Sequence, residues 1–113
     1  MKKIINDITK LTYEPFNNYG KPVKGMSWHK ISYDRETGQG SYILKFEPGT
    51  KSLNHTHVNF EEFYVLDGEL LDEDNTIFKK GDFVSFQPGT HHSSYSKNGC
   101  FLLVFMREKN ELI

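Results

Sequence analysis

Cysteine is almost absent from this sequence, since Cys100 is the single cysteine among 113 residues. No internal disulfide can form, so we expect a fold that does not rely on an oxidising compartment, with Cys100 as a small buried apolar residue. A strong charge of one sign is also missing, because 14 basic and 15 acidic side chains give a formal net charge of −1. We therefore expect neither nucleic acid nor an anionic membrane surface as a partner.

Long hydrophobic runs are missing as well. A membrane helix needs about 20 consecutive apolar residues, and no stretch of the chain approaches that length. The N-terminal MKKIINDITK is interrupted by polar residues, so it lacks the apolar core of a signal peptide. A chain of 113 residues fits one compact domain. We expect a soluble, cytoplasmic protein.

What the sequence does contain is a series of short runs rich in aromatic and β-branched residues. Gly, Pro, Asn or Asp bounds each run, and turn signals such as EPGT, LDGE, EDN, KKGD and QPGT separate them. This spacing predicts an all-β sandwich or barrel. The predicted strands are 27–33, 41–46, 61–66, 83–86 and 101–106. We expect residues 1–26 to form an irregular N-terminal arm, with one helical turn, in the same domain as a barrel of residues 27–113.

The run FLLVFM (101–106) is apolar on both faces, unlike SYILKF (41–46), where one face is apolar and the other is mixed. A strand of this kind is covered on both sides. The second cover is either further packing within the chain or a second copy of it, and we expect a homodimer.

Two histidines and two glutamates stand within the stretch HTHVNFEEFYVL (55–66). On a strand, His55 and His57 point to the same face, and Glu61 joins them if the register holds through Asn59. A plain alternative is a pair of exposed histidines on a sheet face. One of the two adjacent glutamates, however, must face the same side as the apolar residues that follow, and a buried carboxylate is costly unless a cation pairs with it. A divalent metal would supply that cation.

A second cluster, PGTHHS (88–93), follows the predicted strand FVSF. His91 and His92 are adjacent, so only one of them can face the interior if they lie on a strand. His29 stands alone in SWHK, and we expect it to be an ordinary strand histidine.

These two clusters resemble the two motifs of the cupin family. The first motif sets a glycine, HxH, a glutamate and a second glycine at fixed spacings, and the residues that match each spacing are Gly49, His55, His57, Glu61 and Gly68. In the second motif, Gly81 is followed at the family's spacing by a PxG element and by His92. Gln87 replaces the first proline, and Ser96 stands where the family has an asparagine. The resemblance implies an antiparallel β-barrel of the jelly-roll type.

Within the cupins, the short hairpin ELLDEDNTIFKK and the two motifs look most like the cupin domain of ChrR-type anti-sigma factors. The chain has no room for the separate N-terminal zinc-binding helical domain of those proteins, so the resemblance does not carry over anti-sigma activity. It does imply one divalent metal ion (Fe, Ni, Mn or Zn) and a small-molecule substrate or ligand. The implied metal ligands are His55, His57, Glu61 and His92.

The expected function follows from the coordination positions that four protein ligands leave open. An octahedral ion keeps two such positions, which suits a metal-dependent enzyme of the dioxygenase type acting on a small organic acid, diketone or phenolic compound. Two alternatives stay open: a lyase or isomerase that stabilises an enolate at the same ion, and a non-catalytic sensor or regulator with zinc in a closed shell. The aromatic, weakly charged strands speak against a sugar-modifying cupin. Tyr95 is the candidate catalytic residue, and Tyr42 and Tyr64 are other tyrosines near the motifs.

Overall fold

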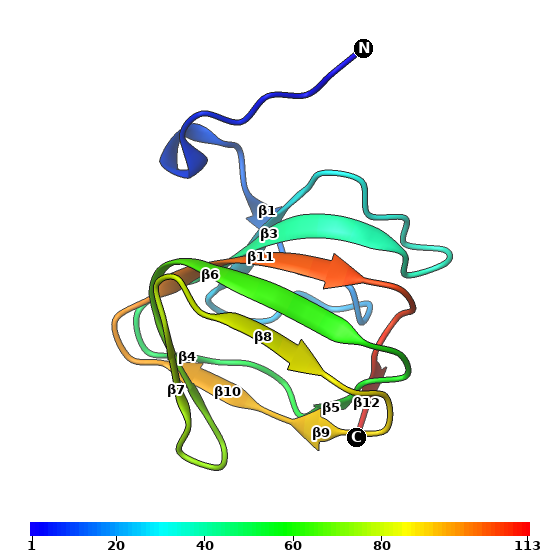
Figure 1. Cartoon of the computed structure of the whole chain (residues 1–113), viewed down its shortest axis with the longest axis vertical. Helices are drawn as coiled ribbons and strands as arrows, with labels where there is room; N and C mark the ends of the chain where they lie inside the picture. The colour runs from blue at the N-terminus through cyan, green and yellow to red at the C-terminus, as the bar shows by residue number, and fades with distance from the viewer.

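The computed structural model describes residues 1–113 and shows an antiparallel β-barrel with a single turn of 3₁₀ helix, η1 (Ile8–Lys10) (Figure 1). The longer strands are β2 (Met26–Lys30), β3 (Gly40–Phe46), β6 (Glu61–Asp72), β8 (Phe83–Phe86) and β11 (Cys100–Met106). The shorter strands are β1 (Glu14–Pro15), β4 (Thr50–Lys51), β5 (His55–Thr56), β7 (Ile77–Lys79), β9 (His91–His92), β10 (Ser94–Ser96) and β12 (Glu111–Leu112).

Two hydrogen-bonded sheets curl around one interior. The larger sheet has the order β1-β2-β3-β11-β6-β10-β4, with β7 and β8 also paired to β6, and the smaller sheet has the order β12-β5-β9. Every pairing is antiparallel. The three strands of the smaller sheet lie together at the lower end of the barrel in Figure 1, close to the C-terminus. This end therefore brings together segments that are far apart in the sequence.

The longest strand, β6, changes register part-way along its length. Two consecutive residues of β11 pair with Asp67 and Val65, so Leu66 is an extra residue that forms a β-bulge. An extra residue reverses the alternation of side chains between the two faces of a strand. Before the bulge the buried residues stand at odd positions, beginning with Glu61, and after it they stand at even positions, ending with Asp72. Both ends of β6 thus direct a carboxylate into the barrel.

Large apolar side chains fill the centre of the barrel. The cross-strand rows at its centre are Leu44–Leu102–Val65 and Tyr42–Val104–Phe63. The N-terminal arm packs against the same core, because Phe16 is only 4% exposed and its ring centroid lies 4.8 Å from that of Trp28 in an edge-to-face contact. Burying a side chain of this size contributes about 1.5–3 kcal/mol. This contact holds the arm on the barrel.

The five strands predicted from the sequence are confirmed, and the turn predicted at LDGE is wrong. Strand β6 continues through Gly68, which lies beside the bulge with a φ of 80°, and the chain reverses instead at the EDN sequence, where Asn75 has a φ of 72°. Most strands of two or three residues were not predicted, because a run this short shows too little alternation of side chains to be recognised. No helix has the length and apolar character that crossing a membrane requires.

Gly68 offers a test of the packing around the bulge. A Cβ atom at this position would clash with the carbonyl oxygen of Gly99, whereas a Cβ at Gly81, which also has a positive φ, would meet no atom within 4 Å. We expect Gly81→Ala to lower the free energy of unfolding by about 1–2 kcal/mol, the cost of the left-handed conformation. Gly68→Ala should cost about 1–3 kcal/mol more, because the carbonyl must move. Urea denaturation of both variants measures the difference, and equal losses would contradict the close approach.

Candidate metal centre

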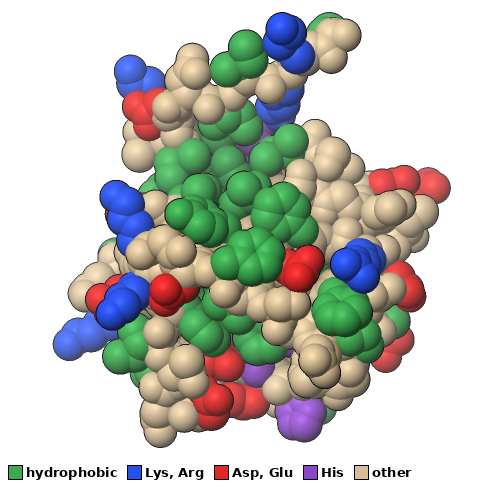
Figure 2. Space-filling view, in the orientation of Figure 1, with side chains coloured by type: hydrophobic (Ala, Val, Ile, Leu, Met, Phe, Trp, Pro, Cys, Tyr) green, Lys and Arg blue, Asp and Glu red, His purple; other side chains and the backbone are tan.

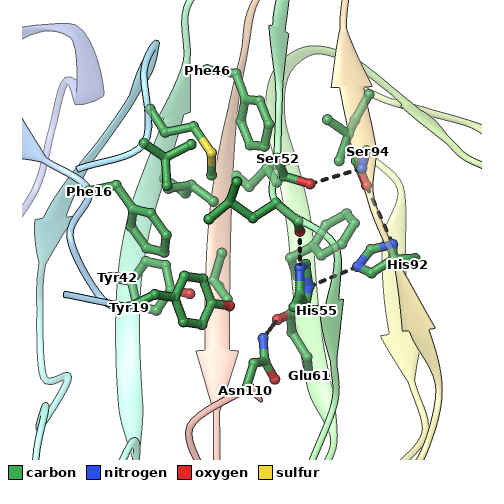
Figure 3. A pocket seen from close by; sticks show the side chains of 18 residues that line it. Phe16, Tyr19, Tyr42, Phe46, Ser52, His55, Glu61, His92, Ser94 and Asn110 are labelled. Atoms are coloured by element: carbon green, nitrogen blue, oxygen red, sulfur yellow. Dashed lines mark hydrogen bonds between the residues drawn. The ribbon is translucent and has the colours of Figure 1, made fainter. Parts of the chain in front are cut away.

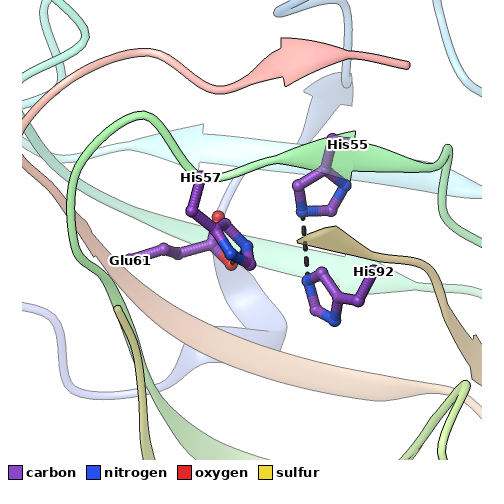
Figure 4. A group of neighbouring side chains, drawn as sticks. All are labelled: His55, His57, Glu61 and His92. Carbon is purple, nitrogen blue, oxygen red and sulfur yellow. Dashed lines mark hydrogen bonds and ion pairs between the residues drawn. The ribbon is translucent and has the colours of Figure 1, made fainter. Parts of the chain in front are cut away.

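Four side chains converge at the end of the barrel that carries the smaller sheet. His55 on β5 is paired directly with His92 on β9, His57 lies just beyond β5, and Glu61 begins β6. Their ligand atoms all lie within 4.8 Å of one another, and all four residues are buried (Figure 4). These residues, hereafter the ligand cluster, are the four that the sequence predicted as metal ligands, and they are positioned to bind a metal ion.

The hydrogen bond at each imidazole Nδ1 determines which ring nitrogen is free. The Nδ1 of His55 lies 2.7 Å from the carbonyl oxygen of Leu53, and the Nδ1 of His92 lies 2.7 Å from Oδ1 of Asp72. A carbonyl oxygen and an ionised carboxylate only accept hydrogen bonds, so both Nδ1 atoms carry the proton. The neutral ring then presents the lone pair of Nε2 to the cluster.

His57 is fixed in the same tautomer through a threonine. Its Nδ1 lies 2.8 Å from Oγ1 of Thr90, and the hydroxyl of Thr90 donates its single proton to the carbonyl oxygen of Gln87 at 2.6 Å. The threonine oxygen therefore accepts from the Nδ1 proton of His57. The Nε2 of His57 is buried and has no hydrogen-bond partner in the protein.

The three free nitrogens suit a shared cation. The Nε2 atoms of His55 and His92 lie 3.1 Å apart, and two donors held about 2.1 Å from one ion at a right angle are separated by roughly 3.0 Å. Two lone pairs this close repel each other unless a cation lies between them. Burial lowers the pKa of His55, which favours the neutral ring with a free lone pair on Nε2. The donor set therefore fits a divalent metal.

Charge and hydrogen bonding complete this fit. Burial lowers the pKa of His57 to about 4, so this ring is neutral and ready to coordinate at pH 7. The side-chain nitrogen of Asn110 donates to Oε1 of Glu61 at 2.6 Å. This leaves Oε2 of Glu61, which lies 3.7 Å from Nε2 of His57, as the free carboxylate oxygen. Three neutral imidazoles and one carboxylate around a divalent ion give a net charge of about +1.

Asp72 is a residue of the candidate site that the sequence did not predict. Its buried carboxylate accepts from His92, and the hydroxyl of Ser94 lies 3.4 Å from the same oxygen. A carboxylate behind a ligating histidine fixes the orientation of the ring and raises its basicity. Strict alternation along β6 from Glu61 places Asp72 on the outer face, and the bulge reverses that assignment.

A cavity of about 40 Å³ opens beside the ligand cluster (Figure 3). Twelve of its 18 lining residues are hydrophobic, and none is a lysine or arginine. The polar residues outside the cluster are Ser52, Ser94 and Asn110, and Tyr19 and Tyr42, which are among the twelve, add hydroxyl groups. The side-chain oxygen of Asn110 is buried without a partner, so it is an acceptor available to a ligand. The cavity thus combines one polar, metal-binding end with an apolar body.

A comparison of sequences identifies the family of this site. The sequence profile of the ChrR Cupin-like domain family matches residues 1–110. This chain belongs to that cupin family. No curated protein matches the chain.

Solved structures similar to this cupin share its fold at low sequence identity. The polyketide cyclase RemF from Streptomyces resistomycificus has 21% identity and a TM-score of 0.70, with 100% of this chain and 86% of that chain covered. An acetylacetone dioxygenase from Acinetobacter johnsonii has 16% identity and a TM-score of 0.69, with 94% of this chain and 77% of that chain covered. A chain in the structure of Rhodobacter sphaeroides SigE in complex with the anti-sigma ChrR has 17% identity and a TM-score of 0.69, with 88% of this chain and 50% of that chain covered. The cupin thus spans about half of that last chain.

Of the three tyrosines named from the sequence, only Tyr42 lines the cavity. Tyr95, the predicted candidate for catalysis, is 38% exposed and does not line the cavity, because its neighbour Ser94 on β10 takes the inward position. Tyr64 likewise faces outward, whereas Tyr42 lines the cavity. Tyr19, which no motif marks, reaches the cavity from the N-terminal arm. Tyr95 therefore cannot contact a ligand at the cluster in this arrangement.

The remaining histidines and the cysteine lie outside the cluster. His91 is exposed next to buried His92, as alternation on β9 requires. His29 lies on β2, 3.1 Å from the carbonyl oxygen of Thr12. Cys100 is buried, and burial raises the pKa of its thiol to about 11, so it is an inert apolar side chain at neutral pH.

Replacing single ligands tests the cluster. We expect His55→Ala, His57→Ala, His92→Ala and Glu61→Ala each to weaken binding of a divalent ion by more than about 100-fold, because each removes a donor directly. Glu62→Ala is the matched control, since Glu62 pairs with Ser85 on the outer face of the barrel. Metal per chain, measured by elemental analysis after equilibration with Co²⁺, should not change in this variant. Full retention of metal in all the ligand variants, or equal loss in Glu62→Ala, would refute the assignment.

Proposed function

We propose that this cupin is a metal-dependent enzyme of the oxygenase type that acts on a small organic acid or diketone. The observation that carries the proposal is the ligand cluster itself, three of whose members, His55, Glu61 and His92, line a largely apolar cavity. Four protein ligands leave two positions of an octahedral ion for exchangeable molecules. The ion would be held by His55, His57, Glu61 and His92.

The chain's own residues would prepare the site for this chemistry. A bound Fe, Ni or Mn ion supplies Lewis acidity and a place for dioxygen beside the substrate. Asp72 holds the ring of His92, and Asn110 holds the carboxylate of Glu61, so both donors are oriented in advance. Tyr19 and Tyr42 offer hydroxyl groups to a ligand in the cavity, and the apolar wall keeps bulk water out.

The size of the cavity favours the smaller substrate classes. A volume of about 40 Å³ corresponds to roughly three water molecules. A cavity that holds benzene has about 150 Å³, so a phenol and a diketone, which are of similar size, both require side chains to move, and the shortest organic acids require the least movement. The similar fold of an acetylacetone dioxygenase, an enzyme named for a diketone, separately supports a diketone as the substrate.

A second function, a sensor or regulator without catalysis, is favoured by one feature of the cluster. Three histidines and one carboxylate are enough to close a tetrahedral zinc shell, which leaves no position for a substrate. The match to the ChrR Cupin-like domain family and the fold shared with the structure of the SigE–ChrR complex support this alternative.

Elemental analysis of protein purified without chelators or metal-affinity columns separates these functions. We expect about one Fe, Ni or Mn ion per chain, because an enzyme of this type needs an ion with open positions. Oxygen consumption with short diketones and short-chain keto acids should then exceed that of the His57→Ala control. Zinc at about one per chain, without any oxygen consumption after exchange for Fe²⁺, would support the sensor and contradict the oxygenase.

We also propose that the cupin forms a homodimer through the outer face of the larger sheet. Figure 2 shows hydrophobic side chains gathered on this face. They include Tyr64, Phe83 and Phe105, which are 40%, 57% and 41% exposed, and the rings of Phe83 and Phe105 lie 6.5 Å apart. Exposed aromatic patches of this kind mark association sites. A two-fold related copy would cover the patch with the same patch.

A charge placed within the patch tests the dimer. We expect the wild-type protein to have the mass of two chains in light scattering after size exclusion, and Phe83→Asp to have the mass of one, because the interface would bury an unpaired carboxylate. Ile77→Asp is the control, since Ile77 is 56% exposed but lies on β7, away from the patch. A monomeric wild-type protein, or the same mass shift in both variants, would contradict the proposal.

A further inference from the structure

A surface pocket adjoins the cavity of the ligand cluster. This outer pocket has a volume of about 520 Å³ and is lined by Tyr19, Lys21, Pro22, Val23, Lys24, Lys51, Leu53 and Leu112. Three of these residues, Tyr19, Val23 and Leu53, also line the inner cavity. They form a partition one side chain thick between solvent and the candidate metal centre. No other pocket described on the surface shares more than one lining residue with the inner cavity.

The outer pocket is strongly basic although the chain is not. Lys21, Lys24 and Lys51 line it, and none of its lining residues is acidic. All three lysines are exposed, and none of them forms an ion pair with a carboxylate. The whole chain has a net charge of −1, so this gathering of positive charge is local. A concave site lined by charge of one sign concentrates ligands of the opposite sign and speeds their arrival.

The inner cavity has the opposite character. It contains no lysine or arginine, and its wall is mostly apolar. The positive charge available inside would be the net charge of about +1 that a divalent ion keeps after coordination by Glu61. One negative charge on a ligand can be neutralised there. A second one would be buried without a partner, which is costly.

The partition between the two spaces is made of movable side chains. Leu53 lies in the loop between β4 and β5 and is 41% exposed. Tyr19 lies in the N-terminal arm beside Gly20, and its ring stacks on that of His55 with centroids 6.4 Å apart. Rotation of a half-exposed leucine is fast. Such a rotation opens the partition without disturbing the carbonyl of Leu53 that holds His55.

We infer that the outer pocket is the entrance to the metal centre, and that the entrance and the cavity together select a small monoanion with an apolar body. A short-chain carboxylate or an enolate has this chemistry. The three lysines attract the anion, the partition formed by Tyr19, Val23 and Leu53 admits it, and the apolar cavity excludes a second charge. This inference rests on the proposed metal centre and adds the class of ligand and its route.

The test uses the full chain loaded with Co²⁺, whose visible spectrum changes when a ligand replaces bound water. The probes are butanoate, its neutral analogue butanamide and the dianion succinate, mixed rapidly at low ionic strength. The entrance variant is Lys21→Gln/Lys24→Gln/Lys51→Gln. The control carries the same change of net charge elsewhere, as Lys79→Gln/Lys80→Gln/Lys97→Gln, at three exposed lysines outside both spaces.

We expect the entrance variant to bind butanoate at least about 10-fold more slowly than the control, with Co²⁺ content unchanged. The rate for butanamide should be the same in both proteins, and succinate should bind at least about 10-fold more weakly than butanoate. Leu53→Trp should slow butanoate and butanamide alike, because it fills the partition. Butanoate rates that are equal in the two lysine variants would overturn the entrance while the metal centre stands. Failure of wild-type protein to bind Co²⁺ would overturn both the metal centre and the entrance.

Discussion

The organisation of this cupin depends on one repeated interaction, the hydrogen bond that each cluster imidazole donates from Nδ1. The three acceptors are of different kinds: a main-chain carbonyl at Leu53, a hydroxyl at Thr90 and a carboxylate at Asp72. Each comes from a different part of the barrel, so the loop after β4, the turn before β9 and the end of β6 must all be in place together. When these three segments are in place, the hydrogen bonds orient the rings so that the three Nε2 atoms face one another. The preference for a cation is therefore built into the backbone connections of the fold as much as into the four ligands.

Strand β6 is the element that makes this possible. It carries a ligand at its first residue, Glu61, and the support for another ligand at its last, Asp72. One of these positions is odd-numbered and the other even-numbered, so a regular strand would direct their side chains to opposite faces and one of them would point outward. The extra residue at the bulge reverses the alternation, so both side chains point inward. Gly68 allows the close approach to β11 beside the bulge. A backbone irregularity in the middle of the wall thus determines the chemistry at the end of the barrel.

Sequence reasoning captured the parts of the protein that follow simple periodicity. The alternation of side chains placed His55, His57 and Glu61 on one face, and all five longer strands were predicted, although the prediction ended β6 six residues early, at 66. It failed where periodicity is interrupted or where an irregular segment supplies the residue. Asp72 lies beyond the bulge, and Tyr19 lies in the arm, where neither pattern nor motif marks it. Tyr95 was chosen for its place near a motif, and its strand directs it outward because Ser94 and Ser96 take the inner positions. The basic entrance was also out of reach, because its lysines come from two segments that only the fold brings together.

The hydrogen bond from Asn110 to Glu61 has a consequence for the order in which the site is made. Strand β12, which follows Asn110, pairs with β5, the strand of His55. During synthesis the histidines and the glutamate leave the ribosome long before these partners do. The glutamate therefore stays unsupported and β5 keeps an open edge until Asn110 and β12 have emerged. The finished geometry of the candidate metal centre therefore forms only after Asn110 and β12 have emerged, and a shorter nascent chain presents only separate, flexible donors to the ions around it.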